Sequence, residues 1–189
     1  MSVPRLRLAH LLMPLCLALA CAPRMAEIRM DPMEIVAAKT DDGLVVEVMD
    51  PEALFDEGVR AFEQKQFPEA ARKFSLILTR FASSRFAPPA LFNRGLVFLA
   101  DGRPREAARD FERYLAEHPD DPEPADVWQR LGEACSESGD WVRAETALRR
   151  RMANWPMTLL QEAEVRARLV RSLRMQGRID EAMAEAVRI

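Results

Sequence analysis

The stretch WQRLGEACSESGDWVRAETAL, residues 128–148, decides the fold because it contains the parts of a helical hairpin. Gly132 is a small residue within the first helical segment, and Gly139 supplies the left-handed residue that ends such a helix. Ala144 and Leu148 lie one turn apart on the same face of a second helical segment. Pro156 then stops the second helix. The stretch therefore predicts two antiparallel helices that approach closely at small residues.

The same features recur along the chain, in LFDEGVRAFEQKQFPEAARKF (54–74), LFNRGLVFLADGRPREAARDF (91–111) and RARLVRSLRMQGRIDEAMAEA (166–186). The small position of the first helix recurs with spacings of 37, 37 and 38 residues, at Gly58, Gly95, Gly132 and Val170. The alanine of the second helix recurs at Ala70, Ala107, Ala144 and Ala182, and the turn glycine at Gly102, Gly139 and Gly177, with Lys65 in the first unit. A single helical pair cannot bury its apolar face, so the units are expected to stack.

The third unit resembles the tetratricopeptide repeat at Trp128, Leu131, Gly132, Ala144, Leu148 and Pro156. The resemblance implies an all-α, right-handed superhelix of about three and a half helical hairpins over residues 51–189. Its expected units are 51–87, 88–124, 125–162 and an incomplete 163–189. The fourth unit departs from the family at Val170, which replaces the glycine. Cys135 stands where the family has an aromatic residue, which implies a packed core position.

The family binds peptides and helices on the concave side, which the first helix of each unit lines. The binding positions that the resemblance implies are Phe55, Val59, Phe62, Phe92, Leu96, Leu99, Asp126, Gln129, Glu133, Glu137, Arg171 and Arg174. They predict an apolar groove in units one and two beside an acidic third unit, which favours a helical partner carrying Arg or Lys. The carboxylate clamp of chaperone-binding members is not expected, because Phe55 and Val59 replace its polar residues. Alternatively, residues 33–49 or a helix before the first unit cover the groove.

The first twenty residues read as a secretory signal peptide, with Arg5 and Arg7 ahead of an apolar run that ends in small residues. Ala18-Leu19-Ala20-Cys21 resembles the lipobox of bacterial lipoproteins, which implies removal of residues 1–20 and a lipid on Cys21. Several acyl chains give durable anchoring. Ala22, in place of an aspartate, implies the periplasmic face of the outer membrane. The alternative is ordinary cleavage near Ala20 that leaves a free thiol.

Residues 21–50 are the expected lipidated tether. Within them, MEIVAAKTDDGLVVEVM (33–49) carries two runs rich in Ile and Val on either side of Asp42-Gly43, a favoured hairpin turn. The segment is either a small β-hairpin or a mostly extended tether.

Several function classes receive no support from the sequence. The formal net charge is −3, with 27 basic and 30 acidic residues and no basic block, so nucleic-acid binding is not expected. After the signal, His118 is the remaining histidine, which excludes the usual serine-protease triad and a two-histidine zinc site. No phosphate-binding loop occurs. We expect no enzyme activity, cofactor, metal or small-molecule substrate.

These observations predict a non-enzymatic, lipid-anchored scaffold that binds other envelope proteins. The resemblance extends to lipoproteins that serve β-barrel protein insertion, pilus, secretin or motility machinery, or cell-wall coordination. The alternative is the docking region of a longer enzyme whose catalytic domain lies beyond Ile189.

Overall fold

The computed structural model describes residues 33–40, 43–119 and 124–188. The predicted signal peptide and the predicted lipidation site Cys21 lie outside the described residues. Two antiparallel strands come first, β1 (Glu34–Thr40) and β2 (Gly43–Met49). Their register pairs Thr40 with Gly43, so Gly43 begins the second strand and is not a turn residue as the sequence suggested.

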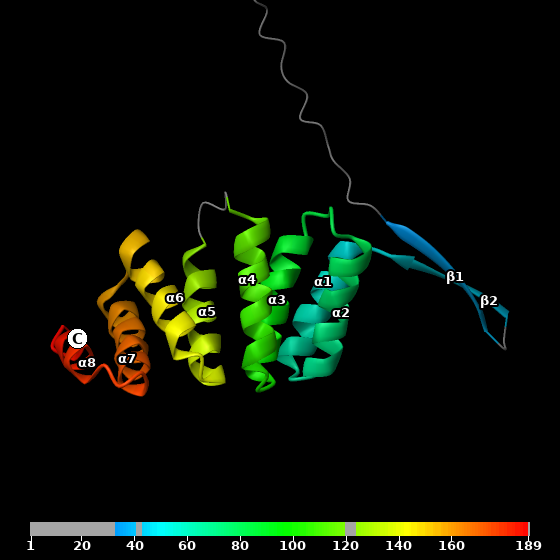
Figure 1. The fold of residues 1–189 in the computed structure, drawn as a ribbon. Helices are drawn as coiled ribbons and strands as arrows, with labels where there is room; N and C mark the ends of the chain where they lie inside the picture. The colour runs from blue at the N-terminus through cyan, green and yellow to red at the C-terminus, as the bar shows by residue number, and fades with distance from the viewer. Residues whose placement is uncertain (1–32, 41–42, 120–123, 189) are drawn as a thin grey trace, which may run out of the picture. The chain divides into compact units, whose positions relative to one another are not determined.

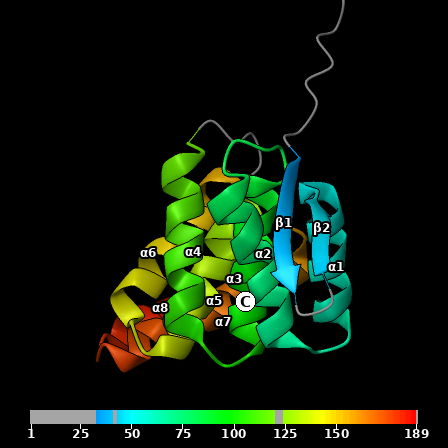
Figure 2. The ribbon, with the colours of Figure 1, turned by 90° about the vertical axis from the view of Figure 1, so that its right-hand side faces the viewer.

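Eight helices follow in the described part of the chain and stand side by side in chain order (Figure 1). Their bounds are α1 (Pro51–Glu63), α2 (Phe67–Arg80), α3 (Ala87–Ala100), α4 (Pro104–Glu117), α5 (Ala125–Ser138), α6 (Trp141–Asn154), α7 (Leu159–Met175) and α8 (Ile179–Ala186). Each helix packs on the helix before and after it, which gives four stacked hairpins, the last one short. Figure 2 looks along this row of helices from the side of β1 and β2. The predicted all-α solenoid is confirmed.

Left-handed residues end the first helix of each hairpin. Gly102, Gly139 and Gly177 have φ of 70°, 80° and 77°, as the repeat predicted. Lys65 takes the same position in the first hairpin with φ 59°, a conformation that is unfavourable for a residue with a Cβ. The fourth hairpin starts at Leu159, earlier than the predicted 163, because Thr158 and Gln161 form a capping box there.

Within each hairpin, a large side chain of the second helix fills the space above the small residue of the first. A Cβ placed on Gly58 or Gly95 would lie 2.8 Å from Phe74 Cε1 or 2.6 Å from Phe111 Cε1. A Cβ on Gly132 would lie 2.6 Å from Leu148 Cδ2. These glycines are therefore required by the bulky side chain that faces them.

The fourth hairpin has neither the glycine nor the large side chain at these two positions. Val170 stands at the glycine position, and Ala186 stands sixteen residues later, where the other units have Phe74, Phe111 and Leu148. Val170 packs against the third core cluster, which includes Val165, Leu169 and Leu173. The departure from the family at Val170 thus coincides in the sequence with a small residue, exposed at the end of α8, at the position of the large side chain in the other units.

Polar contacts add to the apolar core. Arg94 of α3 donates two hydrogen bonds of 2.7 Å to the carboxylate of Asp110 on α4, and one of 3.0 Å to Ser75 Oγ on α2. Asp110 is buried, with 8% of its side chain exposed. The ion pair therefore lies within the second hairpin, and the hydrogen bond to Ser75 joins it to the first.

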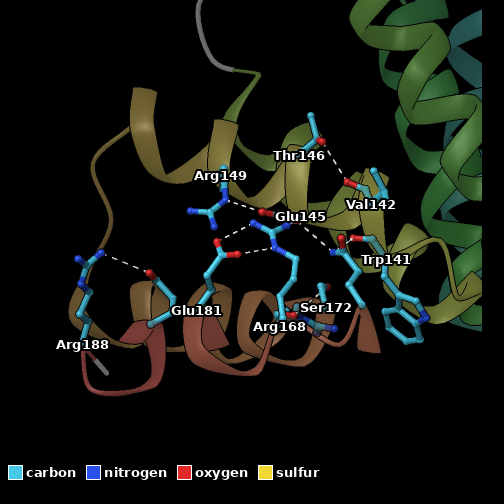
Figure 3. A network of polar contacts seen from close by, with 12 residues as sticks. Trp141, Val142, Glu145, Thr146, Arg149, Arg168, Ser172, Glu181 and Arg188 are labelled. Carbon is cyan, nitrogen blue, oxygen red and sulfur yellow. Dashed lines mark hydrogen bonds and ion pairs between the residues drawn. The ribbon is translucent and has the colours of Figure 1, made fainter. Parts of the chain in front are cut away.

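Glu145 of α6 holds the fourth hairpin to the third (Figure 3). It accepts hydrogen bonds from Arg149, Gln176 and Arg178, and Gln176 also donates to the carbonyl of Trp141 at 3.2 Å. Burial raises the pKa of Glu145, but the hydrogen bonds from Arg149 and Gln176 and the charge of Arg178 outweigh it, so the pKa lies below its usual value.

Candidate protein-binding surface

The first helices of successive hairpins, α1, α3 and α5, together form a hollow of about 360 Å³. It is lined by Phe62, Leu96, Leu99, Ala100, Arg130, Glu133 and Glu137. Five of these residues are ones that the repeat pattern proposed for partner binding: Phe62, Leu96, Leu99, Glu133 and Glu137. The arrangement therefore brings part of the predicted set to one place on the surface.

Phe62, Leu96 and Leu99 form the apolar wall of this hollow. All three are half-buried: Phe62 packs on the first core cluster, and the two leucines pack on the second. Their packed sides are fixed by the hairpins, while their outer sides face the hollow. An apolar side chain of a partner would find a rigid surface here.

Phe55 and Phe92, by contrast, contribute to packing within the hairpins. The Phe55 ring centre lies 5.6 Å from that of Phe74, in an edge-to-face arrangement, and 5.7 Å from that of Phe86. The ring centre of Phe92 lies 5.7 Å from that of Phe111, with the two rings tilted. Phe55 and Phe92 each stand one turn before the glycine of their unit. The ring that packs above this glycine also contacts them. Neither lines the hollow, and neither does Val59, which is half-buried against the first cluster.

The opposite wall is less acidic than the sequence suggested. Glu133 has 16% of its side chain exposed and pairs with both Arg130 Nη1, at 2.8 Å, and Arg168 Nη2, at 2.9 Å. Glu137 is exposed and forms no ion pair within the described residues. The free carboxylate of the hollow is therefore Glu137, while the single charge of Glu133 is more than offset by two guanidinium groups.

Sequence reasoning did not predict the pairing of Arg130 and Arg168 with Glu133. The two arginines occupy the same position in the third and fourth units, 38 residues apart. That spacing brings two cations from neighbouring first helices to one carboxylate. Aligning the charged positions of successive units would have revealed the pairing.

The remaining proposed residues lie outside the hollow. Gln129 is half-buried on α5. Arg171 is exposed on α7, with its guanidinium carbon 5.7 Å from the centre of the Trp141 ring. Arg174 is exposed in the last turn of α7, and Asp126 is exposed in the first turn of α5. The fourth unit therefore contributes Arg168, through Glu133, and not the two arginines that the pattern indicated.

The strand segment has its described helix contacts elsewhere. Arg80 Nη1 of α2 lies 2.7 Å from Glu34 Oε1, and Met49 packs against the first core cluster. Met33 and Ile35 are 59% and 71% exposed. These contacts do not involve Leu96 or Leu99, so they give no support to the alternative in which residues 33–49 cover the hollow.

Other kinds of site are not formed by the described residues. No three His, Cys, Asp or Glu side chains in this part of the chain converge as metal ligands would. None of the described helices has both the length and the apolar character needed to cross a bilayer. The buried Cys135 packs in the second cluster, and burial raises the pKa of its thiol to about 11.

Comparisons with known proteins agree with the helical-hairpin fold described above. Residues 92–156 match the sequence profile of the family described as Tetratricopeptide repeat. A comparison with curated proteins found no match. MamA from Desulfovibrio magneticus RS-1 superposes with a TM-score of 0.60 at 19% identity, over 74% of this chain and 73% of MamA.

Two further solved structures are similar. BtubC (BKLC) from P. vanneervenii has a TM-score of 0.62 at 16% identity, over 74% of this chain and 63% of BtubC. The OM64 TPR domain from Arabidopsis has a TM-score of 0.54 at 17% identity, over 66% of this chain and 94% of that domain. At such identities the likeness concerns the fold alone. The chain is thus a solenoid of helical hairpins with the tetratricopeptide-repeat fold, and residues 92–156 carry that family's sequence pattern.

Proposed function

We propose that this protein is a non-enzymatic scaffold for protein–protein interaction, anchored by lipid on Cys21 at the periplasmic face of the outer membrane. Its role in this proposal is to assist the assembly or stability of an envelope complex. The fold supports the interaction part of the proposal. The lipobox-like Ala18-Leu19-Ala20-Cys21 motif supports the anchoring part.

The observation that carries the interaction role is the hollow on α1, α3 and α5. A volume of about 360 Å³ accommodates one or two large side chains, and Phe62, Leu96 and Leu99 offer them a packed apolar wall. An amphipathic helix that places an apolar side chain in such a groove is a recurring recognition mode. The unpaired Glu137 at the opposite wall favours a Lys or Arg close to that side chain.

In-cell photo-crosslinking tests the interaction role. Leu96 is replaced by a photoreactive residue, and Thr79, which is exposed on α2 away from the hollow, is the matched control position. We expect a discrete adduct with one envelope protein from position 96 that is absent from position 79, identified by mass spectrometry. The same adducts from both positions, or crosslinks from position 96 to residues 33–49 of the same chain, would refute the role of the hollow.

The anchoring role has a separate test. Cys21→Ser removes the acceptor for lipid and is expected to move the protein from the outer-membrane sediment to the soluble periplasmic fraction. Sedimentation that is unchanged in the variant, even after washing at high salt to remove protein partners, would contradict lipidation at Cys21.

A further inference from the structure

The second helices of the second and third hairpins, α4 and α6, face each other across a furrow. On α4, Arg105, Arg109, Glu112 and Ala116 recur at intervals of three and four residues, which places them on one face of the helix. On α6, Arg143 and Ala147 face the same furrow, since they line hollows together with residues of α4. The ion pair between Glu112 and Arg143, at 2.8 Å, crosses the furrow.

On one side of this ion pair the furrow is apolar. A hollow of about 400 Å³ opens there, lined mainly by Leu115, Ala116, Trp128, Leu131, Thr146 and Ala147. Leu131 and Ala147 form its buried floor, while Trp128 is half-buried and Ala116 is exposed at its edge. The volume of this hollow and its apolar lining suit a large apolar side chain of a partner.

On the other side the furrow is cationic. A second hollow of about 440 Å³ is lined by Arg105 and Arg109 together with the turn between α5 and α6. Both arginines are exposed, and neither forms an ion pair with any described residue, although the charge of Arg109 acts on the nearby Glu106. Asp140 also lines this hollow, but its carboxylate is paired with Arg143 at 2.6 Å. Arg150 of α6, with its guanidinium carbon 5.4 Å from the Trp128 ring centre, also has no acidic partner in the described residues.

We infer that this furrow is a second protein-binding surface, and that its partner is a short acidic segment carrying one large apolar side chain. The unpaired charges of Arg105 and Arg109 select carboxylates, and the hollow at Trp128 takes the apolar side chain. Seven residues separate Arg109 from Ala116 on α4, which is about 10 Å along the helix. The carboxylates and the apolar side chain of the partner should be separated by a similar distance.

The furrow is independent of the hollow on α1, α3 and α5. The two surfaces have no lining residue in common, and they differ in the charge that remains unpaired. Each can therefore be disrupted without the other, and a failure of one proposal leaves the other standing.

Peptide selection on the purified full-length chain tests the inference. A displayed library of random 12-residue peptides is panned on the protein, and enriched peptides are measured by fluorescence anisotropy. We expect sequences that combine Asp or Glu with Phe, Leu or Trp. Their affinity should fall by about tenfold or more in the double variant Arg105→Glu/Arg109→Glu, since carboxylates would then face like charges. Ala116→Trp, which fills the hollow from its edge, should cause a similar loss.

Matched controls separate the furrow from general effects of charge and folding. Arg113→Glu makes one such Arg-to-Glu change on α4, half of the charge change of the double variant, but Arg113 pairs with Glu117 and lines neither hollow of the furrow. It should retain affinity within about twofold, as should Leu96→Glu in the other surface. Circular dichroism establishes that each variant is folded.

Three results would overturn the inference. The first is the absence of acidic and apolar sequences among enriched peptides. The second is binding that responds to Leu96→Glu and not to the furrow variants. The third is binding to phosphatidylglycerol vesicles that depends on Arg105 and Arg109 but is unchanged in Ala116→Trp, which would assign the arginines to a lipid surface.

Discussion

Because Phe111 packs above Gly95, we predict that Gly95→Val destabilises the parent protein but not a variant in which Phe111 is replaced by alanine. Gly95→Val places a Cβ 2.6 Å from Phe111 Cε1, whereas ordinary contacts begin at 3.4 Å. The ring is fully buried and rests on Phe92, so it cannot move aside freely. Overpacking of this kind costs about 1–3 kcal/mol, and we expect the upper end because two further methyl groups are added.

Phe111→Ala removes the ring and leaves a cavity, which costs about 3–5 kcal/mol. In this background Gly95→Val meets no ring, and its side chain enters the cavity. The pair then reproduces Val170 and Ala186 of the fourth hairpin. We expect Gly95→Val to be neutral or stabilising here, which gives a coupling free energy of about 2–3 kcal/mol between the two positions.

Urea unfolding followed by circular dichroism at 222 nm measures this cycle. Ala53→Val, at an exposed position of α1, is the control for placing a β-branched residue in a helix and should cost about 0.5 kcal/mol. Destabilisation of equal size in both backgrounds, or a Gly95→Val variant as stable as the parent, would refute the steric account of the glycine.

Three further predictions concern single groups. Arg94→Met leaves the buried Asp110 without its partner and should lower the free energy of unfolding by about 3–5 kcal/mol. Much of this loss should be recovered in the double variant Arg94→Met/Asp110→Leu. A loss below about 1 kcal/mol in urea unfolding would contradict the burial of this pair. The Cys135 thiol, with its pKa raised to about 11 by burial, should react with a thiol reagent at pH 8 only after unfolding, and fast labelling of the native protein would contradict its core position. Because the pKa of Glu145 is lower in the folded than in the unfolded chain, its ion pairs stabilise the fold above the usual carboxyl pKa, and this stability is lost as the pH falls below about 4. Melting temperatures between pH 7 and 3 should therefore fall less in Glu145→Gln than in the parent, and parallel curves would contradict this.

The repeat pattern predicted the helices and turns because it rests on local requirements. A left-handed residue must end each first helix, and Gly102, Gly139 and Gly177 could be recognised by spacing alone. Even Lys65 was found in this way, although its side chain disfavours that conformation. The same pattern marked Val170 as an anomaly, because it compared residues at one position only. The accompanying change to Ala186, from Phe or Leu in the other units, emerges when positions sixteen residues apart are compared.

The binding surface was predicted less completely, since position in a repeat does not determine which atoms of a side chain stay exposed. Phe62 and Phe55 are both aromatic residues of α1, yet Phe62 lines the hollow and Phe55 is held between Phe74 and Phe86. The formal charge of Glu133 likewise suggested an acidic surface that its two ion pairs remove. Its two arginine partners come from α5 and α7, and a count of acidic residues in one unit could not include the second.

The two proposed surfaces differ in the charge that each leaves unpaired, and this difference bears on how a scaffold assembles a complex. The hollow on α1, α3 and α5 retains the carboxylate of Glu137, whereas the furrow between α4 and α6 retains the guanidinium groups of Arg105 and Arg109. A basic segment that suits the hollow at Glu137 would meet like charges at Arg105 and Arg109 in the furrow, and like charges at an interface are strongly unfavourable. Two different partners could then occupy one molecule without competing. Each surface is built on packed helices, so binding at one need not alter the shape of the other. Simultaneous binding of a basic and an acidic segment, with affinities equal to those measured separately, is the behaviour that this arrangement predicts.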